Sequence, residues 1–77
     1  MRRNLKNART GAGFTQYSFA KEIGISRSYY SQLESGLKNV PRGWQVAIRM
    51  KLHNAEDDLF HNTDEALRRG HPYKSEA

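Results

Sequence analysis

The densest group of side chains able to make specific contacts lies between residues 26 and 32. Nearly every side chain in this segment donates or accepts hydrogen bonds, and the set is Ser26, Arg27, Ser28, Tyr29, Ser31 and Gln32. Such side chains suit the major groove of DNA, where each base pair presents its own pattern of donors and acceptors. The segment therefore indicates a surface that reads nucleic acid.

Residues that could support catalysis or metal binding lack the required spacing. His53, His61 and His71 are not spaced as metal ligands, and the chain has no cysteine to complete a zinc site. The acidic run at 56–58 fits the first turn of a capped helix better than an acid–base pair. The Gly-Ala-Gly run at 11–13 fits a helix stop better than a dinucleotide-binding loop. We expect no enzymatic activity, no cofactor and no metal.

Charge is unevenly distributed along the 77 residues. Residues 1–54 hold ten Lys and Arg against two Asp and Glu, a net of +8, and residues 55–77 hold three against six, a net of −3, which gives +5 in total. A concentrated basic segment suits a polyanion because neutralised phosphates release counterions. The sequence shows neither a signal-peptide pattern nor the roughly 20 apolar residues of a membrane span, so we expect a single small cytoplasmic domain.

Helical spacing and cap residues predict the elements that hold these side chains. A first helix ends at the 11–13 run, and Thr15 then caps a second helix that Gly24 terminates. Ser26 caps a third helix that ends at Gly36. The residues expected to face inward from these three helices are Leu5, Ala8, Phe19, Ala20, Ile23, Tyr30 and Leu33.

The second half of the chain predicts further helices and a polar tail. A basic loop at 37–43 precedes a fourth helix, whose apolar stripe is Trp44, Ala47, Ile48 and Leu52. Asn54 is placed to cap a short fifth helix that presents Leu59 and Phe60. We expect a domain over residues 1–60 and a polar extension over 61–77, with helical turns at 63–70 and disorder from 72 onward.

The second and third helices, with Gly24, Ile25 and Ser26 between them, have the pattern of a helix-turn-helix. In that motif the second helix enters the major groove of DNA. Ala20 is small enough for a close crossing of the two helices, Gly24 suits a positive φ, and Ile25 packs the turn into the core. The outward face of the third helix is then left for base contacts.

The motif also matches a known family. The matching residues are Gln16, Phe19, Ala20, Gly24, Ile25, Ser26, Leu33, Glu34, Ser35, Gly36, Leu59 and Phe60. With them the chain resembles the phage repressor and Cro family, also called Xre-type regulators, from about residue 5 to residue 60. The resemblance implies an all-α fold, a compact five-helix bundle of the lambda-repressor-like type with the helix-turn-helix at its second and third helices.

The resemblance further implies roles for single residues. Base contacts are assigned to Arg27, Ser28, Gln32 and Tyr29. Phosphate contacts are assigned to Gln16, Ser26, Ser31, Lys38, Asn39 and Arg42. For Tyr29, a phosphate contact or a place over the edge of the core remains an alternative. Arg9 and Glu34 match a structural pair that ties the first helix to the end of the third, and Tyr30 stands where the family usually has Ile or Val.

Family members usually act as homodimers on a near-palindromic operator, and three apolar residues lie where such an interface could form. They are Leu52, Leu59 and Phe60. The alternative is that the core of one chain buries all three.

Three functions are consistent with these features. The first is a transcriptional regulator, most simply a repressor, of a phage, plasmid or integrated element. The second is the DNA-binding antitoxin of a toxin–antitoxin pair, with residues 61–77 as the segment that holds the protein partner. The third is a protein-interaction module that keeps the fold, against which the basic loop and the polar face of the third helix count.

Overall fold

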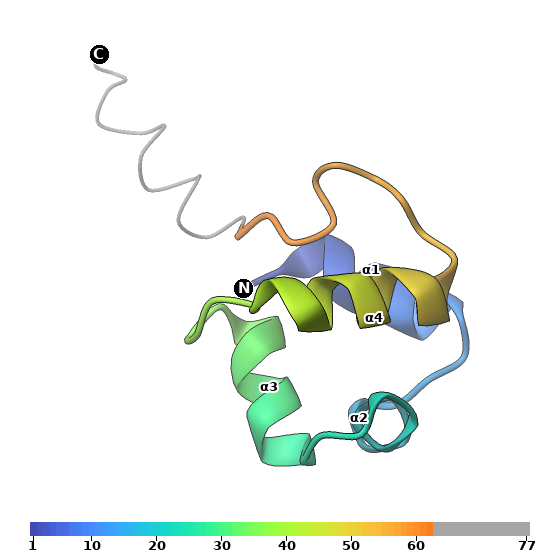
Figure 1. Cartoon of the computed structure of the whole chain (residues 1–77), viewed down its shortest axis with the longest axis vertical. Helices are drawn as coiled ribbons and strands as arrows, with labels where there is room; N and C mark the ends of the chain where they lie inside the picture. The colour runs from blue at the N-terminus through green and yellow to red at the C-terminus, as the bar shows by residue number, and fades with distance from the viewer. Residues whose placement is uncertain (63–77) are drawn as a thin grey trace.

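The computed structural model describes residues 1–62, which form a small bundle of four α-helices (Figure 1). The helices are α1 (Arg3–Gly11), α2 (Gln16–Ile23), α3 (Arg27–Ser35) and α4 (Arg42–Leu52). Within residues 1–62 there is no β-strand, so the all-α prediction is confirmed. In this part of the chain no helix is long and apolar enough to cross a membrane. The turns and disorder expected after residue 62 lie outside the described residues.

Local capping chemistry sets the boundaries of α2 and α3, as the sequence predicts. The Thr15 side chain accepts a hydrogen bond from the Ser18 N–H, and the Ser18 hydroxyl accepts one from the Thr15 N–H, which completes a capping box. Gly24 ends α2 with φ of 91°, and Ser26 caps α3 through the Tyr29 N–H. These caps hold the turn between the two helices, which lie together in the lower part of Figure 1.

The core is built from apolar side chains of all four helices and of the segments that follow α3 and α4. Its buried members are Leu5, Phe19, Ala20, Tyr30, Leu33, Val40, Ile48 and Leu59. Phe19 and Tyr30 pack edge to face with ring centroids 5.4 Å apart, which joins α2 to α3. Ile25 packs against this cluster from the turn, as expected. The helix-turn-helix is therefore fixed to the rest of the bundle by aromatic packing.

One face of α4 covers the core. Ile48 is completely buried, and Trp44 and Leu52 are partly buried against the core. Val46 and Met50 lie on the exposed side of the same helix. The predicted apolar stripe of the fourth helix therefore points inward, and α4 holds the bundle closed behind the helix-turn-helix.

The predicted fifth helix is not present among the described residues. Asn54 does act as a local cap, because its Oδ1 accepts a hydrogen bond from the Glu56 N–H at 2.8 Å. The residues after it form turns, in which the Leu59 N–H donates to the Glu56 carbonyl and the His61 N–H to the Asp58 carbonyl. Hydrogen bonds between residues three apart close turns rather than an α-helix. The segment is held instead by burial of Leu59, which is 1% exposed.

Replacing Gly24 by Ala is expected to destabilise the domain by about 1–2 kcal/mol, because a residue with a Cβ is strained at a φ of 91°. A Cβ at Gly24 meets nothing within 4 Å, so the loss reports backbone strain alone. Thermal unfolding measures it, with Gly11→Ala as the matched control. Gly11 lies in α1 with equally open space around it, and its replacement should stabilise by about 0.5–1 kcal/mol. Equal melting temperatures for the two variants would contradict this account of the turn.

Candidate nucleic-acid interface

The outward side of α3 carries the side chains expected to contact bases. Arg27 and Ser28 are exposed at the start of the helix, and Gln32 is partly exposed one turn further along. Tyr29 is also partly exposed, but it packs against the core as well. The structure thus places three of the four expected base contacts on an accessible surface, and gives Tyr29 a packing role in addition.

The expected phosphate contacts come from three places: the cap and body of α3, the loop that follows it together with Arg42 at the start of α4, and Gln16 at the start of α2. Lys38, Asn39 and Arg42 are exposed, and Ser31 is partly exposed on α3 itself. Ser26 is exposed too, but its hydroxyl oxygen already accepts the Tyr29 N–H at 3.1 Å. Ser26 therefore serves the fold as the cap of α3, and its O–H remains a donor.

A side chain of the loop also lies near an aromatic ring of α3. The Lys38 Nζ lies 5.9 Å from the centre of the Tyr29 ring. An ammonium group within about 6 Å of an aromatic face is attracted by its electron-rich centre. The contact places a positive charge of the loop beside Tyr29 of α3, so an expected phosphate contact lies next to an expected base contact.

A second part of the site lies where α2 begins. An open hollow is lined there by residues of the first turn of α2, by Arg27 of α3 and by the end of α1: Arg9, Thr10, Phe14, Thr15, Gln16, Tyr17 and Arg27. The first N–H groups of a helix have no partner within that helix and favour anions. The hollow therefore brings Gln16 and Arg27 to one surface that suits a phosphate.

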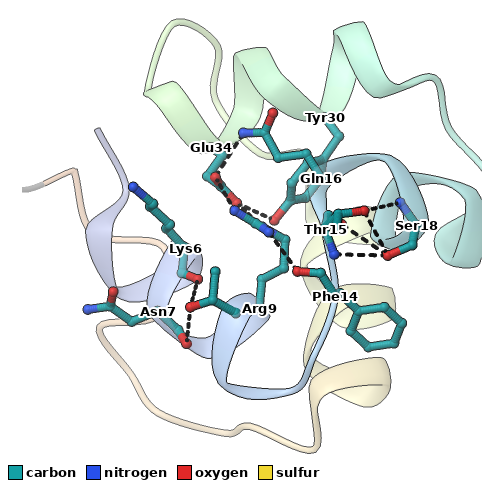
Figure 2. Close-up of polar contacts among 10 residues, drawn as sticks. Lys6, Asn7, Arg9, Phe14, Thr15, Gln16, Ser18, Tyr30 and Glu34 are labelled. Carbon is teal, nitrogen blue, oxygen red and sulfur yellow. Dashed lines mark hydrogen bonds and ion pairs between the residues drawn. The ribbon is translucent and has the colours of Figure 1, made fainter.

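Two residues that line this hollow, Arg9 and Gln16, contact the buried carboxylate of Glu34 (Figure 2). Glu34 is 1% exposed, and its two oxygens accept hydrogen bonds from Nε and Nη2 of Arg9 at 2.8 and 3.1 Å. Gln16 Nε2 donates to the same carboxylate at 2.9 Å, and the Tyr30 hydroxyl donates at 2.8 Å. Arg9 also donates from Nη1 to the Phe14 carbonyl at 2.7 Å. Arg9 and Glu34, expected as a pair, thus belong to a network of four side chains.

The network determines the protonation of its members. Burial acts to raise the pKa of Glu34, but the hydrogen bonds from Arg9, Gln16 and Tyr30 outweigh it and hold that pKa below its ordinary value. Burial and the hydrogen bond to Glu34 raise the pKa of Tyr30, so its hydroxyl stays protonated and donates. The hydrogen bond to Glu34 raises the pKa of Arg9. The carboxylate is therefore charged, and its donors remain fixed around it.

Sequence reasoning missed two members of this network. Gln16 was expected at phosphate, and its contact with Glu34 gives it a structural partner as well. Tyr30 was recognised only as a core residue, although it stands four residues before Glu34, a spacing that places two side chains on one helix face. That spacing was the signal available in the sequence.

The three expected dimer residues do not share one environment. Leu59 is 1% exposed in the core of the single chain, so a second copy cannot reach it and the alternative reading holds for this residue. Leu52 and Phe60 are partly buried against the same core. Phe60 also lies under the guanidinium of Arg49, whose central carbon is 5.0 Å from the ring centre. Only part of the expected interface therefore remains accessible.

Replacing Glu34 by Gln is expected to destabilise the domain by about 3–5 kcal/mol at pH 7, because Arg9 is left buried without its counter-charge. The lowered pKa of Glu34 makes its contribution fully present above the unfolded value of about 4.3, and it is lost as the pH falls further. Denaturant unfolding at pH 7 and at pH 3 to 4 measures both effects.

Two further variants control this prediction. Glu22→Gln removes a carboxylate whose ion pair with Lys51 is about half exposed, so the change should be at most about 1 kcal/mol. Tyr30→Phe removes one donor to Glu34 and should move acid unfolding to a higher pH. Acid unfolding at the same pH in Tyr30→Phe and in the unaltered protein would count against the network.

Comparison with known proteins identifies the group to which this arrangement belongs. The family model described as Helix-turn-helix matches residues 5–43, which is 39 of the 77 residues. No curated protein and no solved structure matched the chain. The matched range covers most of α1, all of α2 and α3, and the basic loop, the elements that build the surface described above. The chain belongs to the helix-turn-helix family of phage repressor and Cro (Xre) type, whose members are DNA-binding transcription regulators.

Proposed function

We propose that this protein is a repressor that binds a near-palindromic operator as a homodimer, with α3 of each copy in the major groove. The observation that carries the proposal is the pairing of an exposed, hydrogen-bonding face on α3 with an exposed basic loop beside it. A DNA reader needs base contacts for sequence and phosphate contacts for register, and these two surfaces supply one each. A regulator of this kind works in the cytoplasm.

The base contacts are proposed for Arg27, Ser28 and Gln32. Arg27 suits the two acceptors of guanine, and Gln32 suits the donor and acceptor of adenine. Both lie toward the accessible side of α3, and neither is a member of the buried network around Glu34. Tyr29 is proposed to contribute at the edge of this set, since its ring is partly committed to the core and to Lys38.

The phosphate contacts are proposed for two groups on either side of α3. Lys38, Asn39 and Arg42 hold the backbone on the side of the loop, and Gln16 holds it on the side of α2. Ser26 and Ser31 add hydroxyl donors along α3. Of these side chains, Lys38 has its ammonium 5.9 Å from the centre of the Tyr29 ring, close to the proposed base contacts.

Dimer formation is proposed because one recognition helix covers too few base pairs to mark a single site in a genome. With Leu59 committed to the core, the proposed contact residues are Leu52 and Phe60, which are only partly buried against it. A two-fold interface of this kind brings the same patch of each copy together. It would present two α3 helices to successive turns of the duplex.

Selection of bound duplexes from a random DNA pool tests this function. We expect a near-palindromic site whose half-site centres lie roughly 34–36 Å apart. Arg27→Ala and Gln32→Ala should each weaken specific binding by about 1–3 kcal/mol and relax preference at one base pair in each half-site. Retention of the full base preference by both variants would show that α3 does not read the sequence. An asymmetric half-site bound by one copy would exclude the dimer.

Replacing Lys38 or Arg42 by Ala should weaken binding to all DNA sequences about equally and lower the slope of log affinity against log salt by about one unit. Affinity measured over a range of salt concentrations gives this slope. The matched control is Lys51→Ala, which removes the same charge from the other end of α4, where Lys51 is paired with Glu22. A changed base preference with an unchanged slope would contradict the assignment of the loop to phosphates.

A further inference from the structure

Arg2 is a buried cation that neither the helix-turn-helix pattern nor the charge distribution singles out. It precedes α1 and is 6% exposed. Its Nη1 donates to the carbonyls of Leu33 at 2.6 Å and Lys38 at 2.9 Å, and its Nε donates to the carbonyl of Phe60 at 2.9 Å. Its backbone N–H donates to the Glu34 carbonyl at 2.7 Å. One residue therefore joins the end of α3, the basic loop and the segment after α4.

Two of these contacts complete the carboxyl end of α3. The last carbonyls of a helix have no partner within it, and the negative end of the helix dipole favours a cation there. The last turn of α3 contains no basic residue of its own. The backbone N–H and the guanidinium of Arg2 supply both the donors and the charge, at the carbonyls of Glu34 and Leu33.

The contact with the Lys38 carbonyl fixes the loop relative to α3. The same Nη1 that reaches Leu33, in the last turn of α3, also reaches the carbonyl of Lys38. The guanidinium is planar and its donors point in fixed directions, whereas the ammonium of lysine is a single flexible point of charge. An arginine at this position can thus reach Leu33 and Lys38 through Nη1 while Nε reaches Phe60, which spreads the contacts over two nitrogens of one rigid group, whereas a lysine has a single nitrogen.

We propose that Arg2 is a positioning residue for DNA binding, which holds the phosphate-contacting loop in register with the base-reading helix without touching DNA itself. The inference rests on the proposed function, because it assigns the loop and α3 to two kinds of DNA contact. It predicts that replacing Arg2 lowers DNA affinity and the salt slope in the same way as losing the phosphate contact of Lys38. A purely structural arginine would lower stability without that specific effect.

The test uses the full chain with Arg2→Lys, which keeps the charge and removes the fork. Hydrogen exchange of the Leu37 and Lys38 amides, which donate to the Gln32 carbonyl at 3.1 and 3.3 Å, should become roughly tenfold faster relative to the Phe19 amide. Affinity for the selected operator should fall roughly tenfold, and the salt slope should fall by about one unit. Sucrose is added to the buffer so that both Arg2→Lys and the unaltered protein stay folded during the measurement.

Two controls separate positioning from stability. Ile48→Val trims a completely buried apolar residue of α4, whereas the hydrogen bonds of Arg2 given above go to α3, the loop and Phe60. It should lower the melting temperature while leaving the salt slope unchanged. In a Lys38→Ala background, Arg2→Lys should cost clearly less in affinity than in the unaltered protein, because the Lys38 phosphate contact that Arg2 is proposed to position is already gone. Additive effects of the two changes, or a normal slope in Arg2→Lys, would overturn the proposal.

The outcomes also distinguish this proposal from the proposed function. If the unaltered protein selects no DNA site, the proposed function fails, whereas exchange of the Leu37 and Lys38 amides still reports whether Arg2 holds the loop. If the unaltered protein binds its operator and Arg2→Lys changes neither the exchange nor the slope, the function stands and the role of Arg2 is wrong. Ile48→Val shows in both cases how much of any change comes from stability alone.

Discussion

The structure depends on one buried anion, the carboxylate of Glu34, which is 1% exposed. Removing a carboxylate from water costs several kcal/mol, so it is tolerated only where donors surround it. Here the donors come from three helices: Arg9 from α1, Gln16 from α2 and Tyr30 from α3 itself. Because each must lie within about 3 Å of one carboxylate, the network fixes how α1, α2 and α3 sit relative to one another. The direction in which the outer face of α3 points follows from it.

The parts of the fold that sequence reasoning predicted are those with local causes. Thr15, Gly24 and Ser26 act through neighbours within a few residues, so their caps and the turn could be read directly from the chain. The prediction of a fifth helix was wrong for the opposite reason. The segment after Asn54 takes its shape from distant contacts, burial of Leu59 in the core and the hydrogen bond from Arg49 to the Glu56 carbonyl, and no local pattern shows them.

The same division holds for the candidate site. The exposed face of α3 follows from helical spacing, because the positions that do not face the core must face outward. The contacts that position this face join residues far apart, such as the contact of Arg2 with Lys38 and that of Gln16 with Glu34. Apolar residues near the end of the domain posed a related difficulty, since burial in one chain and burial between two chains require the same side chains. Only the folded structure distinguishes these two kinds of burial, and it buries Leu59 in the core of the single chain.

Gln16 shows how the buried network and the proposed DNA contacts are connected. A carboxylate can only accept hydrogen bonds, so Glu34 must face the NH₂ end of the Gln16 amide. One N–H of that group is then used, and the other remains to donate to a phosphate on the side of α2. The amide oxygen of Gln16 then points away from Glu34. It can accept a hydrogen bond from a neighbouring donor, such as a side chain proposed to contact a base. The buried carboxylate thus orients the Gln16 amide at the surface. The same network that fixes the helices also determines which end of this amide donates and which accepts in the proposed interface.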